Sequence, residues 1–79
     1  MNMMSEFVVI EGSPLIGLKL EDLVSKYGVE VLHFHNPSFD SETKIPYQPS
    51  YSIQKNSLIK VSGEDENVRQ LRLESVNYH

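Results

Sequence analysis

LEDLVSKYGV, residues 20–29, is the stretch that decides the fold. Its apolar side chains recur at the spacing i, i+3, i+4, i+7, which predicts one buried face of a helix: Leu20, Leu23, Val24 and Tyr27. Gly28 follows the last apolar position, where a glycine in the left-handed conformation commonly ends a helix. A helix of about two turns is not stable alone, so we expect it to pack on a sheet.

Short strands are predicted on both sides of this helix. Phe7-Val8-Val9-Ile10 is rich in β-branched and aromatic side chains and leads into turn residues, which predicts a strand over Ser5–Glu11. Val29–His35 is predicted to be the second strand. Alternation places its side chains on two faces, with Leu32 and Phe34 on one and Val31, His33 and His35 on the other.

The second half of the chain predicts two more strands and a second helix. Asn36–Ser52 contains three prolines, which a central strand does not tolerate, so we expect only a short edge strand near Thr43–Tyr47. Lys55-Asn56 is a turn candidate. Leu58–Val61 is predicted to be the last strand and Glu64–Leu73 the second helix.

The resulting order, β-α-β-β-β-α, predicts a single α+β domain over residues 1–79, with both helices packed on a short mixed sheet. We expect residues 1–4 to lie outside the fold, either disordered or added to the start of a domain taken from a longer protein. Residues 74–79 are expected to form a frayed tail. A chain of this size buries a modest core, and self-association is a common way to stabilise it.

The composition argues against several classes of function. The chain has no cysteine, which excludes a disulfide, a thiol nucleophile and cysteine-bound zinc. Its net charge is −4 and its Lys and Arg residues are scattered, so we expect no nucleic-acid partner. No apolar run approaches the roughly 20 residues that cross a bilayer, and the start lacks the pattern of a signal peptide. We therefore expect a soluble, cytoplasmic protein with no membrane insertion.

Two histidines are candidate metal ligands. His33 and His35 share a strand face, and a third donor, Glu30 or His79, would complete a site. Solvent-facing positions explain the pair equally well, and we expect no metal. The consecutive acids Glu64–Glu66 are explained by a helix start, where carboxylates are stabilised, better than by calcium binding.

No catalytic arrangement is evident, so we expect a protein that is not an enzyme. The serines Ser13, Ser25 and Ser38 belong to no Gly-x-Ser-x-Gly motif and to no His–Asp relay. Asp40 and Glu42 could form a catalytic acid/base pair, but they lie in a loop that we expect to be mobile, so we do not assign them this role.

Two tyrosines of the proline-rich segment have two interpretations. Tyr47 and Tyr51 either line a ligand cleft or anchor the segment by packing on the sheet. We consider anchoring the better-supported interpretation.

Four segments occur in an order found in one known family. Glu11-Gly12-Ser13-Pro14-Leu15-Ile16-Gly17 is similar to a family opening written GSPLVGK. Leu20-Glu21-Asp22-Leu23 and Lys26-Tyr27-Gly28-Val29 are similar to its helix and the Tyr-Gly-Val exit into a strand. Pro46 stands where a proline is common, and Ile53–Gly63 is similar to the closing strand. The ordered set covers nearly the whole chain and resembles the TrkA-C domain, the C-lobe of RCK (regulator of potassium conductance) proteins.

The sequence also departs from this pattern. Lys19 replaces the usual Ser or Thr cap of the helix, a loss that costs about 1 kcal/mol. Asn56-Ser57 replaces the usual Gly-Asp turn, and the segment Asn36–Thr43 is longer than usual.

The resemblance implies a regulatory module that dimerises and binds a small effector. In RCK proteins such a module follows a Rossmann-like lobe and controls potassium channels or transporters, so it implies a role in ion transport. The alternatives are a ligand-free structural oligomerisation module and the sensor domain of a transcriptional regulator. The Gly-rich dinucleotide fingerprint is absent, so no NAD or ATP cofactor is expected.

The resemblance also places an effector site at the helix exit, at the seam between two copies. The residues expected there are Lys26, Tyr27, Gly28, Val29, Val31 and Pro46. Backbone groups at the turn would bind a polar edge of the effector, and the apolar side chains would form walls. The single cation of this stretch is surrounded by the carboxylates of Glu21, Asp22 and Glu30. We therefore expect no cyclic dinucleotide, because its two phosphates need arginines or several free N–H groups.

Overall fold

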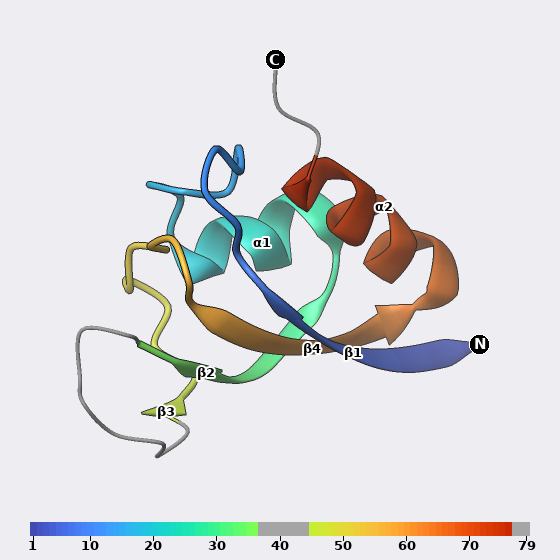
Figure 1. The fold of residues 1–79 in the computed structure, drawn as a ribbon. Coiled ribbons are helices and arrows are strands. Elements are labelled where there is room, and N and C mark those ends of the chain that lie inside the picture. The colour runs from blue at the N-terminus through green and yellow to red at the C-terminus, as the bar shows by residue number, and fades with distance from the viewer. Residues whose placement is uncertain (37–44, 77–79) are drawn as a thin grey trace.

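The computed structural model describes residues 1–36 and 45–76. Its elements follow the expected order (Figure 1): β1 (Asn2–Val8), α1 (Leu20–Tyr27), β2 (Glu30–His35), β3 (Ile45–Pro46), β4 (Leu58–Glu64) and α2 (Asp65–Ser75). The protein is therefore a small α+β domain, as the sequence predicts.

The four strands of the described residues form one sheet in the order β1-β4-β2-β3. Their pairings are antiparallel, which differs from the expected mixed sheet. The crossover through α1 makes β1 and β2 run in the same direction, and as neighbours they would form a parallel pair. β4 lies between them and runs opposite to both, so no parallel pair forms.

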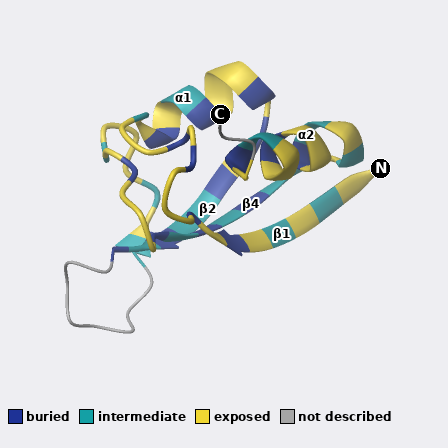
Figure 2. Cartoon of the chain, turned by 45° about the horizontal axis from the view of Figure 1, so that its top comes forward, coloured by how far each residue is buried: buried dark blue, intermediate teal, exposed yellow. Residues whose placement is uncertain are grey.

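Both helices cover the same face of the sheet, and within residues 1–36 and 45–76 no helix covers the other face, which is called the open face below (Figure 1). α2 packs on β1 and β4, and α1 packs on β2 and against α2. Figure 2 shows buried residues where β2 and β4 pass under the helices. β1 alternates between exposed and partly buried residues up to Phe7, which is buried. The largest fully buried side chains form the core between the layers: Phe34, Leu15, Leu20, Leu23, Ile53, Ile59 and Leu71.

β1 begins earlier than the sequence indicates. The structure has Asn2–Val8 where Ser5–Glu11 is predicted, and residues 2–4, expected outside the fold, pair with the end of β4. The backbone of Val9 still bonds to Ser57, after which the turn residue Gly12 takes a φ of 84°. The start of β1 has little strand propensity of its own and is ordered by its partner strand.

α1 has the predicted position and end. Leu20, Leu23 and Tyr27 are buried, whereas Val24 is 38% exposed, so the buried face is narrower than predicted. Gly28 takes a φ of 69°, and its N–H donates a hydrogen bond to the carbonyl oxygen of Val24. This confirms that the helix ends with a left-handed residue.

The start of α1 is capped without the serine or threonine that Lys19 replaces. The carboxylate of Asp22 accepts a hydrogen bond from the Lys19 N–H at 2.7 Å. The N–H groups of the next two residues donate to the carbonyl oxygens of Tyr51 and Pro49. A side chain and a distant loop thus satisfy donors that a helix start leaves without partners.

The loop between β3 and β4 packs on the sheet through Tyr51. Its ring lies on that of Phe34, with centroids 4.2 Å apart, and its hydroxyl shares a hydrogen bond with the hydroxyl of Ser57. Tyr51 is therefore an anchor, as expected. Asn56 has a φ of 69°, in agreement with a turn at Lys55-Asn56.

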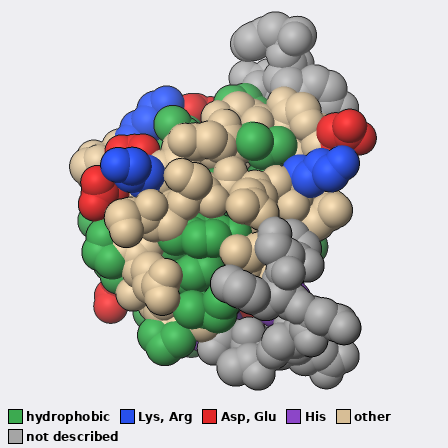
Figure 3. Space-filling view, turned by 90° about the vertical axis from the view of Figure 1, so that its left-hand side faces the viewer, with side chains coloured by type: hydrophobic (Ala, Val, Ile, Leu, Met, Phe, Trp, Pro, Cys, Tyr) green, Lys and Arg blue, Asp and Glu red, His purple; other side chains and the backbone are tan. Residues whose placement is uncertain are grey.

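Figure 3 shows the molecule from the end where the loop between β3 and β4 lies. Hydrophobic side chains gather near the middle of this surface and charged ones near its rim.

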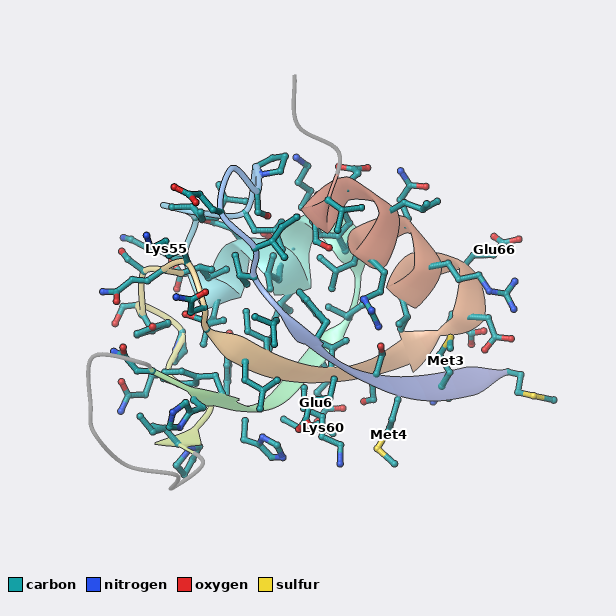
Figure 4. All side chains as sticks on the ribbon, in the orientation of Figure 1. Met3, Met4, Glu6, Lys55, Lys60 and Glu66 are labelled. Atoms are coloured by element: carbon teal, nitrogen blue, oxygen red, sulfur yellow. The ribbon has the colours of Figure 1, made fainter. Side chains whose placement is uncertain are left out.

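β2 contains a bulge that changes which side chains share a face. The pairing with β4 shifts between Val31 and His33, which makes Leu32 the extra residue. Val31 and Phe34 are consequently both buried under the helices. His33 pairs with Lys60, which points to the open face (Figure 4). The predicted placement of Val31 with the histidines is therefore wrong.

The remaining bounds are close to the predicted ones. β3 lies within Thr43–Tyr47, of which residues 43 and 44 are outside the described residues. β4 continues past the predicted Leu58–Val61 to residue 64, and α2 is helical through residue 75, inside the expected frayed tail. Neither helix of the described residues is long and apolar enough to cross a membrane.

Candidate functional site

An open groove lies where α1 leads into β2, with a volume of about 600 Å³. It draws on α1, on the start of β2, on the end of β4, on β1 and on the residue after β3. Its lining consists of Asn2, Val24, Gly28, Val29, Glu30, Val31, Tyr47, Ser62, Gly63 and Glu64.

Three of the six residues expected at an effector site line this groove: Gly28, Val29 and Val31. They come together because the left-handed turn at Gly28 ends α1 and starts the extended chain. β3 pairs with only His33 and Phe34, so within the described residues no strand covers the side of β2 at Glu30 and Val31. The short β3 thus leaves this part of the sheet edge open as one side of the groove.

The other three expected residues do not line the groove. Lys26 is exposed, and its ammonium lies 5.5 Å from the centre of the Tyr27 ring. Tyr27 is buried between the helices. Pro46 is exposed on β3, and it is the following Tyr47 that lines the groove.

Tyr27 has a structural role in joining the two helices. Its hydroxyl donates a hydrogen bond to the Glu74 carboxylate at 2.7 Å. Burial, followed by this hydrogen bond, raises the pKa of Tyr27 to about 12. Hydrogen bonds from Gln70 and then from Tyr27 lower the pKa of Glu74.

No local sequence signal identifies the part of the lining that comes from β1 and β4, namely Asn2, Ser62, Gly63 and Glu64. These residues are far from Gly28 in the chain, and only the position of β4 between β1 and β2 brings them to the groove. From the sequence, Tyr47 is expected to be an anchor rather than a cleft residue. The structure shows that it packs against the core and also lines the groove.

The groove is acidic. It contains the carboxylates of Glu30 and Glu64, and no Lys, Arg or His is found among the described residues that line it. The Met1 ammonium lies 3.0 Å from the Glu64 carboxylate, whereas Glu30 is exposed. Tyr47, Ser62 and Asn2 add neutral hydrogen-bonding groups. A polar ligand that is neutral or positively charged suits this lining, and a phosphate would be repelled.

The two histidines lie on the open face of the sheet, where His33 is opposite Lys60 and His35 is opposite Leu58. A lysine beside His33 is unfavourable for a bound cation. Within residues 1–36 and 45–76, no three His, Asp or Glu side chains are close enough together to hold a metal ion. His79, one of the proposed third ligands, is outside the described residues.

The candidate catalytic serines that the structure describes have local roles. The hydroxyl of Ser13 is buried in a turn and accepts a hydrogen bond from the Leu15 N–H. The hydroxyl of Ser25 donates to the carbonyl oxygen of Glu21. The remaining candidates, Ser38, Asp40 and Glu42, are outside the described residues.

Comparison with known proteins does not identify a family. No protein-family model matches the chain, and no curated protein matches it significantly. The resemblance to the TrkA-C domain therefore stays a hypothesis that rests on the ordered motifs of the sequence.

Proposed function

We propose that the protein is a non-catalytic, cytoplasmic regulatory module that binds a small effector and self-associates, in the manner of the TrkA-C domain. The groove at the exit of α1 carries this proposal. The resemblance implies an effector site at this place, and Gly28, Val29 and Val31 line an open groove there. Such concave sites with a few polar groups are typical of small-molecule binding.

The groove is suited to regulation because it joins elements that are distant in the chain. An effector would contact Val24 on α1, Glu30 on β2 and Ser62 on β4 at the same time. Its binding free energy would therefore favour one arrangement of the helix on the sheet. In an RCK-like protein this change would pass to the Rossmann-like lobe and then to the channel or transporter.

The charge of the groove restricts the class of effector. Because Glu30 and Glu64 are the charged side chains of the lining, we propose a polar effector that is neutral or carries a positive charge. Cyclic di-AMP is not expected to bind, because its phosphates would meet two carboxylates and no arginine.

A thermal-shift screen tests the proposal, because a ligand that binds the folded state raises the melting temperature. The panel should include amino acids, polyamines, NAD, ATP and cyclic di-AMP, and positive compounds should be titrated by calorimetry. Binding should be lost in Glu30→Lys and retained in Glu11→Lys, a control that makes the same charge change in an exposed turn. The proposed effector site is wrong if no compound of the panel binds, or if cyclic di-AMP binds and Glu30→Lys does not weaken a positive compound.

A further inference from the structure

β1 forms an open edge of the sheet on the side opposite β3. It is seven residues long, its register with β4 has no shift, and it contains no proline. Within the described residues, no strand pairs with its outer side. Natural proteins usually protect such an edge with a proline, a bulge or several charges. β1 contains no proline and no bulge, and it has a single charged side chain. Its edge is therefore available for another strand.

The backbone groups that face outward along this edge can be assigned from the ladder. The N–H of Val9 donates to the carbonyl oxygen of Ser57, at the end where β1 and β4 meet. Residues of an antiparallel strand point alternately toward and away from their partner. Asn2, Met4 and Val8 therefore direct their N–H and C=O groups to the open side, where an added strand would bond to them.

An apolar groove of about 370 Å³ runs beside this edge, between β1 and α2. Met3 and Ser5 form its strand side, and Val68, Arg69, Arg72 and Leu73 form its helix side. Leu73 is 65% exposed, although it is a large apolar side chain. In Figure 4, Met3 points toward α2 while Met4 points to the opposite face of the sheet. A side chain of an added strand would thus enter an apolar site on the helix side.

Both arginines of the chain border this groove, although the net charge is −4. Arg72 is held over β1, because its guanidinium donates a hydrogen bond to the Ser5 hydroxyl and lies 5.2 Å from the centre of the Phe7 ring. Arg69 stands one turn earlier on α2. No ion pair links either arginine to a carboxylate of residues 1–36 and 45–76. Guanidinium groups bind carboxylates strongly, often through two hydrogen bonds.

A second copy of the protein fits this edge poorly. In a dimer through this edge, the outward N–H and C=O groups of one β1 strand would bond to those of the other. Two antiparallel β1 strands that pair over their full length then have their Ser5 residues opposite each other. Each Ser5 carries its bound Arg72, so two positive side chains would face each other across the new pair. Like charges opposite each other destabilise a sheet, whereas a partner with carboxylates would neutralise them.

We propose that the edge of β1 and its adjoining groove bind an extended acidic peptide, which adds a strand to the sheet. Side chains at every second position of the peptide face α2. An apolar side chain at one of these positions occupies the groove, and acidic side chains two residues before and after it bind Arg69 and Arg72. Main-chain bonds give such a complex its affinity, and the alternate side chains give its specificity. The lining of this groove shares no residue with the effector groove, and the two sites meet only at Asn2, which lines that groove and also lies at the start of the edge. The peptide proposal does not depend on the proposed function.

Fluorescence anisotropy with a labelled synthetic peptide, Thr-Glu-Thr-Leu-Thr-Glu-Thr, tests the proposal on the full chain. We expect saturable binding that weakens with added salt and that falls about tenfold or more in Arg69→Glu. Arg69→Glu leaves the contacts of Arg72 with β1 in place, and circular dichroism checks that it folds. Lys26→Glu makes the same charge change on α1 and should bind like the wild type. A peptide with Lys in place of both Glu residues should bind Arg69→Glu better than it binds the wild type.

Amide hydrogen exchange locates the peptide. On binding, the N–H groups of Met4 and Val8 should become protected, while that of Phe7, already directed toward β4, should change little. The proposal is overturned if Arg69→Glu binds as well as the wild type, or if the edge amides stay unprotected in the complex. Protection of the same amides without peptide, increasing with protein concentration, would overturn it in favour of a second copy.

Discussion

Gly28 has two roles, because it ends α1 and also lines the candidate site. Its φ of 69° is in the left-handed region, and a Cβ at this position would lie 3.0 Å from the side-chain nitrogen of Asn67. We expect Gly28→Val to lower the free energy of unfolding by about 1–3 kcal/mol, as measured by urea denaturation. Gly28→Asn should lose less, because asparagine tolerates this conformation better than a β-branched residue. Equal stabilities of Gly28→Val and the wild type would show that the turn is not as described.

The raised pKa of Tyr27 predicts that the protein loses stability at alkaline pH. Burial and the bond to Glu74 raise its pKa from 10 to about 12, so the unfolded state loses the proton at a lower pH than the folded state. The stabilisation is therefore fully present below pH 10 and is lost as the pH rises through about 12. Thermal melts between pH 9 and 12 should show a smaller decrease for Tyr27→Phe than for the wild type. Parallel curves for the two proteins would contradict this assignment.

The start of α1 depends on a side chain that replaces the missing cap. Asp22 accepts the hydrogen bond of the Lys19 N–H, so Asp22→Ala should cost about 1 kcal/mol in urea denaturation. Glu21→Ala is the matched control, because it removes a carboxylate from the same turn without removing that hydrogen bond. If the two variants lose equal stability, the general charge at the helix start matters and the specific bond does not.

The elements that the sequence predicts best are those with local signals. α1 is predicted closely because its apolar spacing and Gly28 lie within ten consecutive residues. The start of β1 and the bulge at Leu32 are not predicted, because both are properties of pairing with β4. The candidate site divides in the same way: the turn and the residues after it are predicted, while Ser62 and Glu64 reach the groove only through the strand order.

The part of the molecule that the structure describes has helices on one side of its sheet only. α1 and α2 cover one face of the sheet, and the other face carries Met4, Glu6 and Lys60 (Figure 4). Met4 is 64% exposed and Val8 is 50% exposed. Apolar surface stabilises a protein by roughly 25 cal/mol for each Å² removed from water. A small domain with a modest core therefore gains stability when this open face is covered.

We predict that the protein self-associates through the open face of the sheet. Face-to-face packing would bury Met4 and Val8 of both copies and keep the arginines beside β1 apart. We expect a concentration-dependent dimer in sedimentation equilibrium, with Met4→Lys shifting the protein toward monomer because a charge there would have to be buried. Ile16→Lys is the control, since Ile16 is 41% exposed in the turn before α1. A protein that stays monomeric at high micromolar concentration would exclude self-association, and the open face would then be an ordinary solvent-facing surface.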